Sequence, residues 1–530
     1  MMSRQRTRLY KNCELSMLLD ATNLDEVPDR LDAATVVVGG GTVGLYLALG
    51  FVRARIPVLL CEAGSLVADV SCNDLTAACI GKTHYGIKLG RAFGLGGTSA
   101  LWGGQLAEFE PADLATNCSW PIAFCELQRW YDEVYKFLSV QSRSPVQTYR
   151  LRFGGEKDSK EDVERFFTSW LPQPNFAAHF RKDIFSNPFL TVMLNASMGE
   201  IFFDGNSAKH IEVRTANGRK IVVAGNRFIF AMGTIETNRF FLSTQRTSAV
   251  PWRENQLIGT HFQDHLAGRA AEAVVLNERL FRNFFENGFV DGLKLQPKLR
   301  FSPHARSAVL NGVCGAFSFD SRISEKLGQV KSLVRSIKSG IAFSDFIRLP
   351  ANLWSLSRSI PPLVVRYIRD RRIMAFFDRG LAFHVQSEQI PYRESKIVLL
   401  DGERRPDGLF RAGVDWRIDG REITAINLFI RKVDDYLQKR NIACLQIDED
   451  LSRNDPAFLT KLSDTYHQCG GLRMAGSAAD GVVDADCRVW GTRNVYVAGA
   501  SVFPTSSHAN STLTALALAA RLVERLKAGA

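Results

Sequence analysis

Near the N-terminus, the pattern of hydrophobic positions changes from that of a strand to that of a helix. Residues 35–38 form a continuous β-branched run, which is typical of a strand buried on both faces. Apolar positions then recur at helical spacing through Leu45, Ala48 and Val52, and a second apolar run follows at 58–61. The pattern therefore predicts a strand–turn–helix–strand unit of an α/β protein.

The turn in this unit has the glycines that a bound dinucleotide requires. Gly39 permits the turn, Gly41 lets the backbone approach a pyrophosphate, and Gly44 permits close packing of helix and strand. The N-terminus of the helix then faces the phosphates. Glu62 ends the second strand about 20 residues later, where an acid that binds a ribose is expected. A plain glycine-rich turn is the alternative, but the flanking strand, helix and acid favour dinucleotide binding.

Further elements return to the same sheet from distant parts of the chain. Residues 220–231 predict a hairpin pair of strands that leads into 232–234. Residues 494–499 predict a buried strand of the parallel type, followed by a loop at 500–511 and an apolar helix at 512–526. The nucleotide-binding domain is therefore expected to be discontinuous.

Composition places the chain among globular proteins with more than one domain. It has 530 residues, of which 46% are hydrophobic and 23% charged. No apolar run reaches the roughly 18 residues of a membrane-spanning helix, and none follows the basic N-terminus as in a signal peptide. The ten cysteines form no CxxC pair, which favours buried, reduced thiols and a cytoplasmic location.

The positive charge is concentrated in one segment. The net charge is +11, and residues 321–380 contain twelve Lys or Arg against four Asp or Glu, which is +8. This distribution excludes a nucleic-acid footprint over the whole molecule. The spacing within 331–372 predicts two basic amphipathic helices. Three interpretations of these helices are open: solvated helices packed on a substrate domain, a lid over the active site, or a surface that contacts a membrane or a partner.

The fingerprint alone does not distinguish NAD from a flavin. The chain contains one GxGxxG, whereas a flavoprotein reduced through a second nucleotide-binding domain would usually contain two. No pair of cysteines has the spacing of a redox disulfide beside a flavin. If a flavin is bound, its electrons are therefore expected to come directly from an organic substrate.

Several motifs occur in the order typical of one known family. They lie at 90–104, 259–265, 388–399, 466–484 and 501–510. With them the sequence resembles the glucose–methanol–choline (GMC) oxidoreductases, especially the branch of pyranose oxidase and related sugar dehydrogenases. The resemblance implies an α/β fold (α+β overall), in which a Rossmann-like FAD-binding domain is interleaved with a substrate domain built on an antiparallel sheet with helices. Residues 395–399 resemble part of that substrate-domain sheet.

The resemblance also implies domain boundaries. The FAD-binding domain is expected at 30–110, 187–268 and 466–530, and the substrate domain at 111–186 and 269–465, with the basic helical insertion at 321–380.

The resemblance assigns the catalytic residues. His467 corresponds to the family's base, and Asn510 to the residue that holds the substrate oxygen beside the flavin. His508 is a rival for the base or a second substrate contact. Ser511 replaces the family's proline after Asn510, which is a departure from its pattern. We expect His265 to be structural, and no spacing predicts a metal site.

The fingerprint and the resemblance together predict the cofactor-binding residues. They are Gly39, Gly41, Thr42, Val43, Gly44, Glu62, Ala63, Arg91, Gly97, Thr98, Ser99, Trp102, Gly103, Gly104, Met198, Ala231, Gly233, Ala500, Ser501, Asn510 and Thr512. Pyranose oxidase attaches its flavin through a histidine just before the tryptophan of this loop. Leu101 has that position here, so FAD is expected to be non-covalent.

The resulting hypothesis is FAD-dependent oxidation of a hydroxyl group on a sugar, glycoside or aminocyclitol. The substrate proton goes to His467 and the hydride to flavin N5, and O2 or another carrier accepts the electrons. The expected partners are a small hydroxylated molecule and no nucleic acid. The alternatives are an NAD(P)H-dependent flavin monooxygenase and a flavoprotein with a lyase or structural role for FAD.

Overall fold

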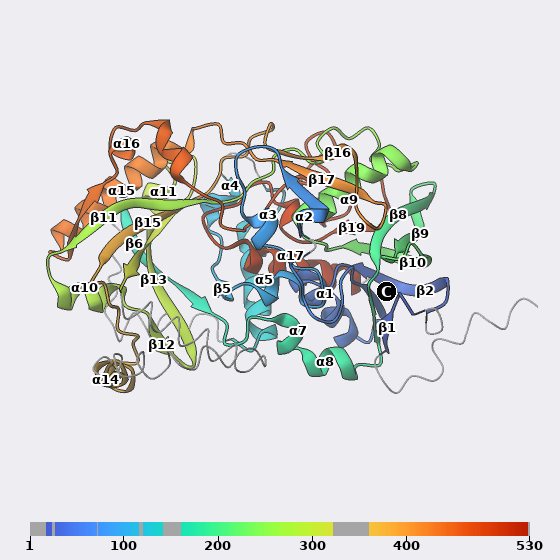
Figure 1. Ribbon diagram of the computed structural model, residues 1–530, viewed down its shortest axis with the longest axis horizontal. Helices are drawn as coiled ribbons and strands as arrows, with labels where there is room; N and C mark the ends of the chain where they lie inside the picture. The colour runs from blue at the N-terminus through green and yellow to red at the C-terminus, as the bar shows by residue number, and fades with distance from the viewer. Residues whose placement is uncertain are drawn as a thin grey trace, which may run out of the picture.

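The computed structural model describes residues 17–23, 27–71, 73–115, 120–140, 161–321 and 360–527. Two large sheets lie at opposite ends of the molecule, and segments from both ends of the chain meet between them (Figure 1). The predicted α/β class, with a Rossmann-like sheet and a separate antiparallel sheet, is confirmed. The domain boundaries stay a prediction.

The first sheet has the mixed arrangement expected for nucleotide binding. Its order is β1 (Met17–Asp20), β7 (Leu190–Leu194), β3 (Val58–Cys61), β2 (Arg30–Val38), β10 (Lys220–Phe230), β9 (Ser207–Arg214) and β8 (Ser197–Asp204), with β19 (Val495–Val497) beside the end of β10. Neighbours from β1 to β10 are parallel, and β10, β9 and β8 are antiparallel. The strands predicted at 35–38 and 58–61 therefore lie side by side, and the strand predicted at 494–499 joins the same sheet beside β10.

The predicted hairpin at 220–231 is wrong. Residues 220–230 form one continuous strand, because Gly225 keeps a negative φ and no turn forms there. A Cβ at Gly225 would lie 2.9 Å from a Val36 methyl group, so this glycine permits close approach within the sheet. The hairpin partner of β10 is instead β9.

Helices cover the first sheet. They are α1 (Thr42–Arg53), α5 (Phe124–Phe137), α9 (Thr234–Thr247) and α17 (Ser511–Lys527). The C-terminal α17 packs against both α1 and α5, and its predicted apolar character places it in the main hydrophobic core.

The second sheet is antiparallel throughout. Its order is β18 (Ala443–Ile447), β11 (Leu266–Val275), β15 (Gly380–Ser387), β14 (Val313–Asp320), β13 (Leu293–Phe301), β6 (Val163–Trp170) and β5 (Gln105–Leu106), with β12 (Gly288–Val290) beside β13. Helix α15 (Glu422–Lys439) covers one face, where Phe429 packs against Phe301 and Phe383. The other face is turned toward the first sheet (Figure 1).

Residues 395–399 do not belong to this second sheet, which corrects the expectation from the resemblance. They form part of β16 (Lys396–Arg404), which pairs with β17 (Phe410–Asp415) and, through it, with β4 (Ala77–Cys79). Hydrogen bonds between β17 and β4 connect this three-stranded sheet to the N-terminal part of the chain, and α9 packs on it.

Short helices connect these layers. They are α2 (Asn73–Thr76), α3 (Gly86–Leu89), α4 (Pro111–Ala115), α7 (Phe176–His179), α8 (Arg181–Ser186), α10 (Glu278–Phe285), α11 (Pro303–Arg306), α14 (Ile360–Asp370) and α16 (Glu449–Ser452), with the 3₁₀ helices η1 (Gly97–Ala100), η3 (Pro456–Lys461) and η4 (Ala500–Val502).

The basic segment is described only in its last part. The first predicted helix, at 331–341, lies outside the described residues, and the second is α14. Arg366 pairs with Glu286 at 2.7 Å and with Asp370 at 2.8 Å, so part of the positive charge is neutralised internally. The apolar side chains of Val365 and Ile368 are exposed. None of the described helices is long and apolar enough to cross a membrane.

The cysteines differ partly from the expectation. Cys61, Cys314, Cys469 and Cys487 are buried free thiols, but Cys79 and Cys125 are exposed. Their exposure corrects the prediction of buried thiols, because Cys79 lies at the end of β4 and Cys125 in the first turn of α5, where neither side chain is covered.

Two glycines of α1 provide a matched test of the packing. A Cβ at Gly44 would lie 1.8 Å from the carbonyl oxygen of Gly39, whereas at Gly50 it would meet methyl groups of Val523 at 3.1 Å and 3.2 Å. We expect Gly44→Ala to lower the free energy of unfolding by about 2 kcal/mol. Gly50→Ala should be close to neutral, since helix propensity favours alanine by about 1 kcal/mol. Thermal unfolding of both variants checks this, and equal midpoints would contradict it.

Candidate functional site

The glycine turn between β2 and α1 leaves backbone open to a ligand. Gly39 has φ +103°, and a Cβ there would lie 2.5 Å from the carbonyl oxygen of Ala231 on the crossing segment. At Gly41, which precedes α1, the nearest atom to a Cβ would be the Gly97 Cα at 4.0 Å. The first N–H groups of α1 point toward this open side, which suits a phosphate.

Glu62 stands at the end of β3 beside this turn. Its carboxylate accepts backbone N–H groups of Gly40 at 2.6 Å, Gly64 at 2.8 Å and Gly94 at 3.0 Å. Burial raises the pKa of Glu62, although these donors act in the opposite direction. The donors hold the acid rigidly, and a carboxylate oxygen can accept more than one hydrogen bond, so a ribose hydroxyl can still bind.

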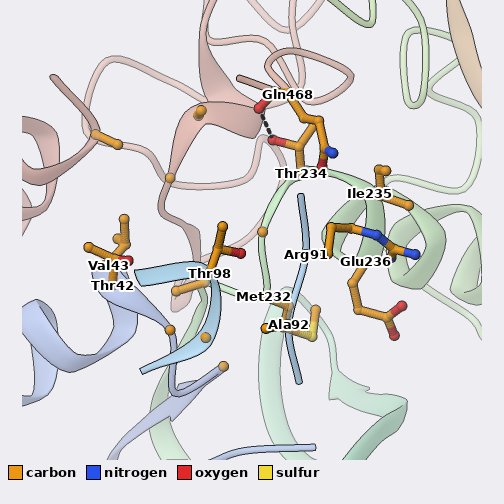
Figure 2. A pocket seen from close by; sticks show the side chains of 18 of the residues that line it. Thr42, Val43, Arg91, Ala92, Thr98, Met232, Thr234, Ile235, Glu236 and Gln468 are labelled. Atoms are coloured by element: carbon orange, nitrogen blue, oxygen red, sulfur yellow. Dashed lines mark hydrogen bonds between the residues drawn. The ribbon is translucent and has the colours of Figure 1, made fainter. Parts of the chain in front are cut away.

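A pocket is lined both by this turn and by His467. Figure 2 shows part of its lining, including Thr42 and Val43 at the start of α1. The predicted cofactor residues that line it are Gly39, Gly41, Thr42, Val43, Glu62, Ala63, Arg91, Gly97, Thr98, Met198, Ala231, Gly233, Ala500 and Thr512. Those that do not line it are Gly44, Ser99, Trp102, Gly103, Gly104, Ser501 and Asn510. Gly44 lies beneath the turn, and Gly103 packs against the ring of Trp170 on β6.

Several lining residues were missed by sequence reasoning. They include Gly90, Ala92, Phe93, Met232, Thr234, Ile235, Glu236, Tyr466, Gln468 and Gly499. The start of α9 contributes three of them, and the Thr234 hydroxyl donates to the Gln468 carbonyl at 2.6 Å (Figure 2). In the sequence, the strand that ends at Phe230 and the glycine that follows it at Gly233 indicate a second turn. The structure places this turn at the pocket.

His467 and Asn510 meet at the far end of the pocket. Asn510 Nδ2 lies 2.9 Å from His467 Nε2, and the Thr465 hydroxyl lies 2.5 Å from His467 Nδ1. An amide nitrogen can only donate, so Nε2 accepts and the proton of the neutral ring sits on Nδ1. The ring therefore presents a lone pair at Nε2, the atom that a base requires.

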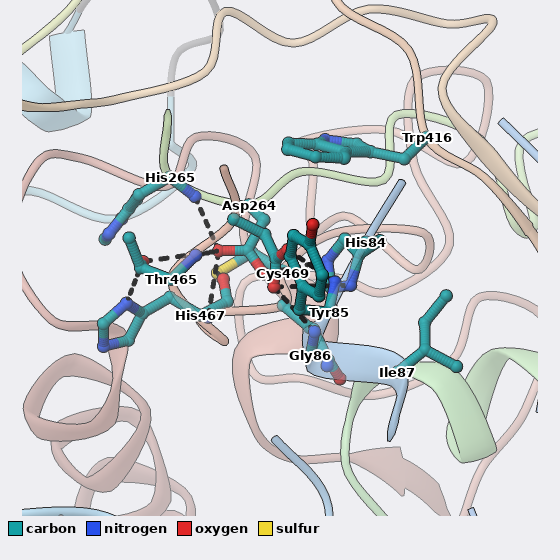
Figure 3. Close-up of polar contacts among 12 residues, drawn as sticks. His84, Tyr85, Gly86, Ile87, Asp264, His265, Trp416, Thr465, His467 and Cys469 are labelled. Carbon is teal, nitrogen blue, oxygen red and sulfur yellow. Dashed lines mark hydrogen bonds and ion pairs between the residues drawn. The ribbon is translucent and has the colours of Figure 1, made fainter. Parts of the chain in front are cut away.

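Asp264 holds the loop that presents His467 (Figure 3). Its Oδ1 accepts the backbone N–H groups of His265 at 2.7 Å, His467 at 3.0 Å and Thr465 at 3.2 Å. Its Oδ2 lies 3.0 Å from His84 Nε2. Although burial alone would raise it, these contacts and the nearby histidines lower the pKa of Asp264, which stays ionised. His265 lies 3.3 Å from the Ser506 carbonyl through Nε2 and 3.1 Å from the Gln386 amide through Nδ1, and its structural role stays a prediction.

The His467 ring is neutral because of its surroundings. Burial lowers the pKa of His467 to about 3, with His265 and Lys298 acting in the same direction and Asp264 opposing them. Burial also lowers the pKa of His265, whose ring centre lies 4.8 Å from that of His467. Both rings are uncharged at neutral pH, so His467 is free to accept a proton.

His508 lies apart from the His467–Asn510 pair. It is 2% exposed, and its ring meets Phe166 edge-on with ring centres 5.9 Å apart. Neither ring nitrogen has a hydrogen-bond partner among the described residues. Burial lowers the pKa of His508 to about 3, against the effect of Asp113. The structure therefore brings His467 and Asn510 together, but gives no hydrogen bond between His508 and either of them.

Two groups of side chains near this site have metal-ligand chemistry. Their potential ligand atoms lie within 4.8 Å of one another, and the groups are His84, Asp264 and Asp464, and Glu110, Asp113 and His508. Protein donors already occupy the carboxylates: four contacts reach Asp264, while Arg306 and the Ser507 hydroxyl bind Asp113 at 3.1 Å and 2.6 Å. The geometry thus favours internal hydrogen-bond networks.

The comparisons with known proteins agree with this geometry. Residues 391–519 match the family model described as GMC oxidoreductase, a segment that includes His467 and Asn510. A stretch of 70 residues is 43% identical to the C-glycoside 3-oxidase of Microbacterium trichothecenolyticum. This alignment spans 13% of the present chain and 13% of that relative.

Solved structures resemble the chain over nearly its whole length. A formate oxidase variant from Aspergillus oryzae RIB40 is 15% identical, with a TM-score of 0.58 over 95% of this chain and 99% of that one. Pyridoxine 4-oxidase from Mesorbium loti is 14% identical, with a TM-score of 0.57 over 93% and 99%. At these identities the likeness shows a shared fold. The match to the GMC oxidoreductase model covers residues 391–519, and the chain shares its overall fold with these two oxidases.

Proposed function

We propose that the chain is an FAD-dependent oxidoreductase that oxidises a hydroxyl group of a sugar, glycoside or aminocyclitol. The observation that carries the proposal is the His467–Asn510 pair, with His467 lining the same pocket as the Gly39–Gly44 turn. The pair combines a neutral base with a hydrogen-bond donor, which is what removal of a hydroxyl proton requires. The neighbours that are named oxidases support redox chemistry with O2 or another acceptor.

The pocket fits FAD. Open backbone at Gly41 and the N-terminus of α1 suit the pyrophosphate, and Glu62 suits the ribose. When bound, the flavin supplies the acceptor for the hydride that leaves the substrate carbon. Leu101 has no nucleophilic group and is 44% exposed, which supports non-covalent binding.

A substrate hydroxyl can replace the hydrogen bond between these two side chains. Asn510 Nδ2 donates to the single lone pair of His467 Nε2 at 2.9 Å, so the hydroxyl must displace this bond before its oxygen lies about 2.8 Å from both nitrogens. Such a hydroxyl donates its proton to Nε2 while its oxygen accepts from the amide. As the proton transfers, the ionised Asp264 and the Thr465 hydroxyl stabilise the imidazolium.

A carbohydrate substrate is supported by one relative. The 43% identical stretch belongs to a protein named C-glycoside 3-oxidase, although the alignment is short. A flavin monooxygenase would have no use for the base–donor pair, and a structural role for FAD would not need it. Failure of NADPH to reduce the enzyme-bound flavin, together with reduction by a sugar, would exclude both alternatives.

Removal of the base tests the proposal. We expect His467→Ala to slow anaerobic reduction of the flavin by a sugar about 10²- to 10⁴-fold, because the hydroxyl proton then lacks an acceptor. Stopped-flow absorbance of the flavin measures the rate. The exposed His304, replaced by alanine, is the control and should reduce at the normal rate. An unchanged rate in His467→Ala would overturn the assignment.

The depressed pKa of His467 predicts the pH dependence. A base is active when unprotonated, and the pKa is lowered from 6.5 to about 3. The rate of flavin reduction should therefore stay level between about pH 8 and 5 and decline only in stronger acid. Circular dichroism at each pH controls for unfolding. A midpoint near pH 6.5 in a folded enzyme would show that the base titrates as an ordinary histidine.

The mode of cofactor attachment has its own test. Because Leu101 stands where a linking histidine would be needed, acid precipitation should release all of the yellow cofactor into the supernatant. Absorbance of pellet and supernatant measures the partition. Colour retained by the precipitated protein would contradict non-covalent binding.

A further inference from the structure

One face of the antiparallel sheet opposes the catalytic pair. On β13, Leu299 and Phe301 point into the core beneath α15, so Gln296, Lys298 and Arg300 project from the opposite face. On the adjacent β14, Cys314 pairs with Arg300 on one side and with Gln386 of β15 on the other. These side chains therefore share the face that is turned toward the nucleotide-binding sheet.

Hydrogen bonds connect this face to His467. The Gln386 amide nitrogen lies 3.1 Å from His265 Nδ1 and donates to the His508 carbonyl at 2.7 Å. The His265 ring is in turn the neighbour of the His467 ring. Phe166 of β6, which pairs with Lys298 of β13, contacts the His508 ring. Lys298 thus lies on the face of the sheet whose side chains contact His265 and His508.

Lys298 is a buried cation without a partner. It is 8% exposed, and among the residues that the structure describes, no hydrogen bond or ion pair reaches its ammonium group. Its cross-strand partner on β6, Phe166, carries no polar side-chain atoms. A buried ammonium without compensation is costly, so the position is expected to be held for a ligand.

The other cations of this region are already paired. Arg300 binds Glu110 at 2.8 Å and Glu164 at 2.7 Å, and Arg306 binds Asp113 at 3.1 Å and Glu388 at 3.2 Å. The field of Lys298 instead reaches uncharged groups. Burial lowers the pKa values of His265 and His467 and Lys298 acts in the same direction, whereas burial raises the pKa of the Cys314 thiol and Lys298 opposes that rise. This face therefore presents one uncompensated positive charge.

Neutral hydrogen-bonding groups surround that charge. Gln105 donates to the Thr168 hydroxyl at 2.6 Å and to the Gln296 carbonyl oxygen at 2.9 Å, next to Lys298 on the same face. Amides and hydroxyls of this kind suit the hydroxyl groups of a carbohydrate. This arrangement offers one cation to bind an anionic group of a ligand and several neutral side chains to form hydrogen bonds with its hydroxyl groups.

We propose that Lys298 binds a carboxylate of the substrate, which makes the preferred substrate class an acidic carbohydrate such as a glycosiduronic acid. This inference rests on the proposed oxidation by His467 and narrows its substrate. Lys298 determines specificity through an ion pair formed in a site from which water is largely excluded, where a single charge has a large effect.

The test compares two ligands that differ in one group. Methyl β-glucuronide and methyl β-glucoside are titrated into FAD-loaded His467→Ala protein by calorimetry, where turnover does not interfere. We expect the acid to bind at least tenfold more tightly. In Lys298→Met on the same background this preference disappears, while binding of the neutral glycoside changes less than about threefold. Lys298→Arg should retain the preference, which separates loss of charge from loss of fold.

Lys294→Met is the matched control on the same strand. Its ammonium lies over the ring of Trp170, at 4.3 Å from the ring centre, and its replacement should leave the ratio of affinities unchanged. Equal binding of the two glycosides, tighter binding of the neutral one, or a preference that survives Lys298→Met would overturn the inference.

The proposed oxidation is tested separately, by measuring anaerobic reduction of the flavin in protein that retains His467. If neither glycoside reduces the flavin anaerobically, hydroxyl oxidation of these sugars is contradicted, whereas the calorimetric ratio still decides the role of Lys298. If both reduce it at equal efficiency, oxidation stands and the preference for an acid is contradicted.

Discussion

The buried carboxylate of Asp264 is the constraint on which the site depends. It is fully enclosed and receives donors from segments 180 and 203 residues away in the chain, at His84 and His467. An ionised carboxylate in this setting is stable only while its donors are present, because the cost of an unpaired buried charge is several kcal/mol. The three segments are therefore held together, and the orientation of His467 follows.

A base must be uncharged before it accepts a proton and must be stabilised once it is charged. This arrangement meets both requirements. Burial keeps the His467 ring neutral, so that Nε2 can accept a proton, while Asp264 and Thr465 are placed to stabilise the ring once it is charged. The acidic and basic residues behind the sheet are paired with one another, as in Arg300 with Glu110 and Glu164. Lys298 has no such partner among the residues that the structure describes, and its charge acts on His265 and His467.

Much of the site could be predicted because its elements are local. Gly39, Gly41 and Gly44 act through backbone geometry within one turn, and Glu62 ends the strand that follows at a spacing set by one helix. His467 and Asn510 were found through short motifs. Their mutual distance of 2.9 Å could not be inferred from motifs alone, since 43 residues separate them and the contact depends on how α17 and the Asp264 loop pack.

Other features depended on pairing partners that no local pattern specifies. Residues 220–230 contain a Gly-Asn pair typical of a turn, but neighbours on both sides keep them in one strand. Residues 396–404 form a strand as expected, yet β17 and β4 recruit them to a third sheet. The lining contributed by Met232, Ile235 and Tyr466 likewise arises where two turns converge on one pocket.

By itself, the sequence determined the strand–turn–helix unit, the use of both chain ends in one sheet, and the choice of His467 and Asn510 as the candidate base and its amide partner. Those properties reside in spacings of a few residues and in side-chain chemistry. Only the tertiary structure decided which charged side chains have a partner of opposite charge. In sequence, Lys298 is one of 66 basic residues. The fold buries Lys298 beside the apolar Phe166 of β6, where no other residue that the structure describes forms a hydrogen bond or ion pair with its ammonium group. Burial and pairing are long-range properties, because they depend on residues that folding alone brings together.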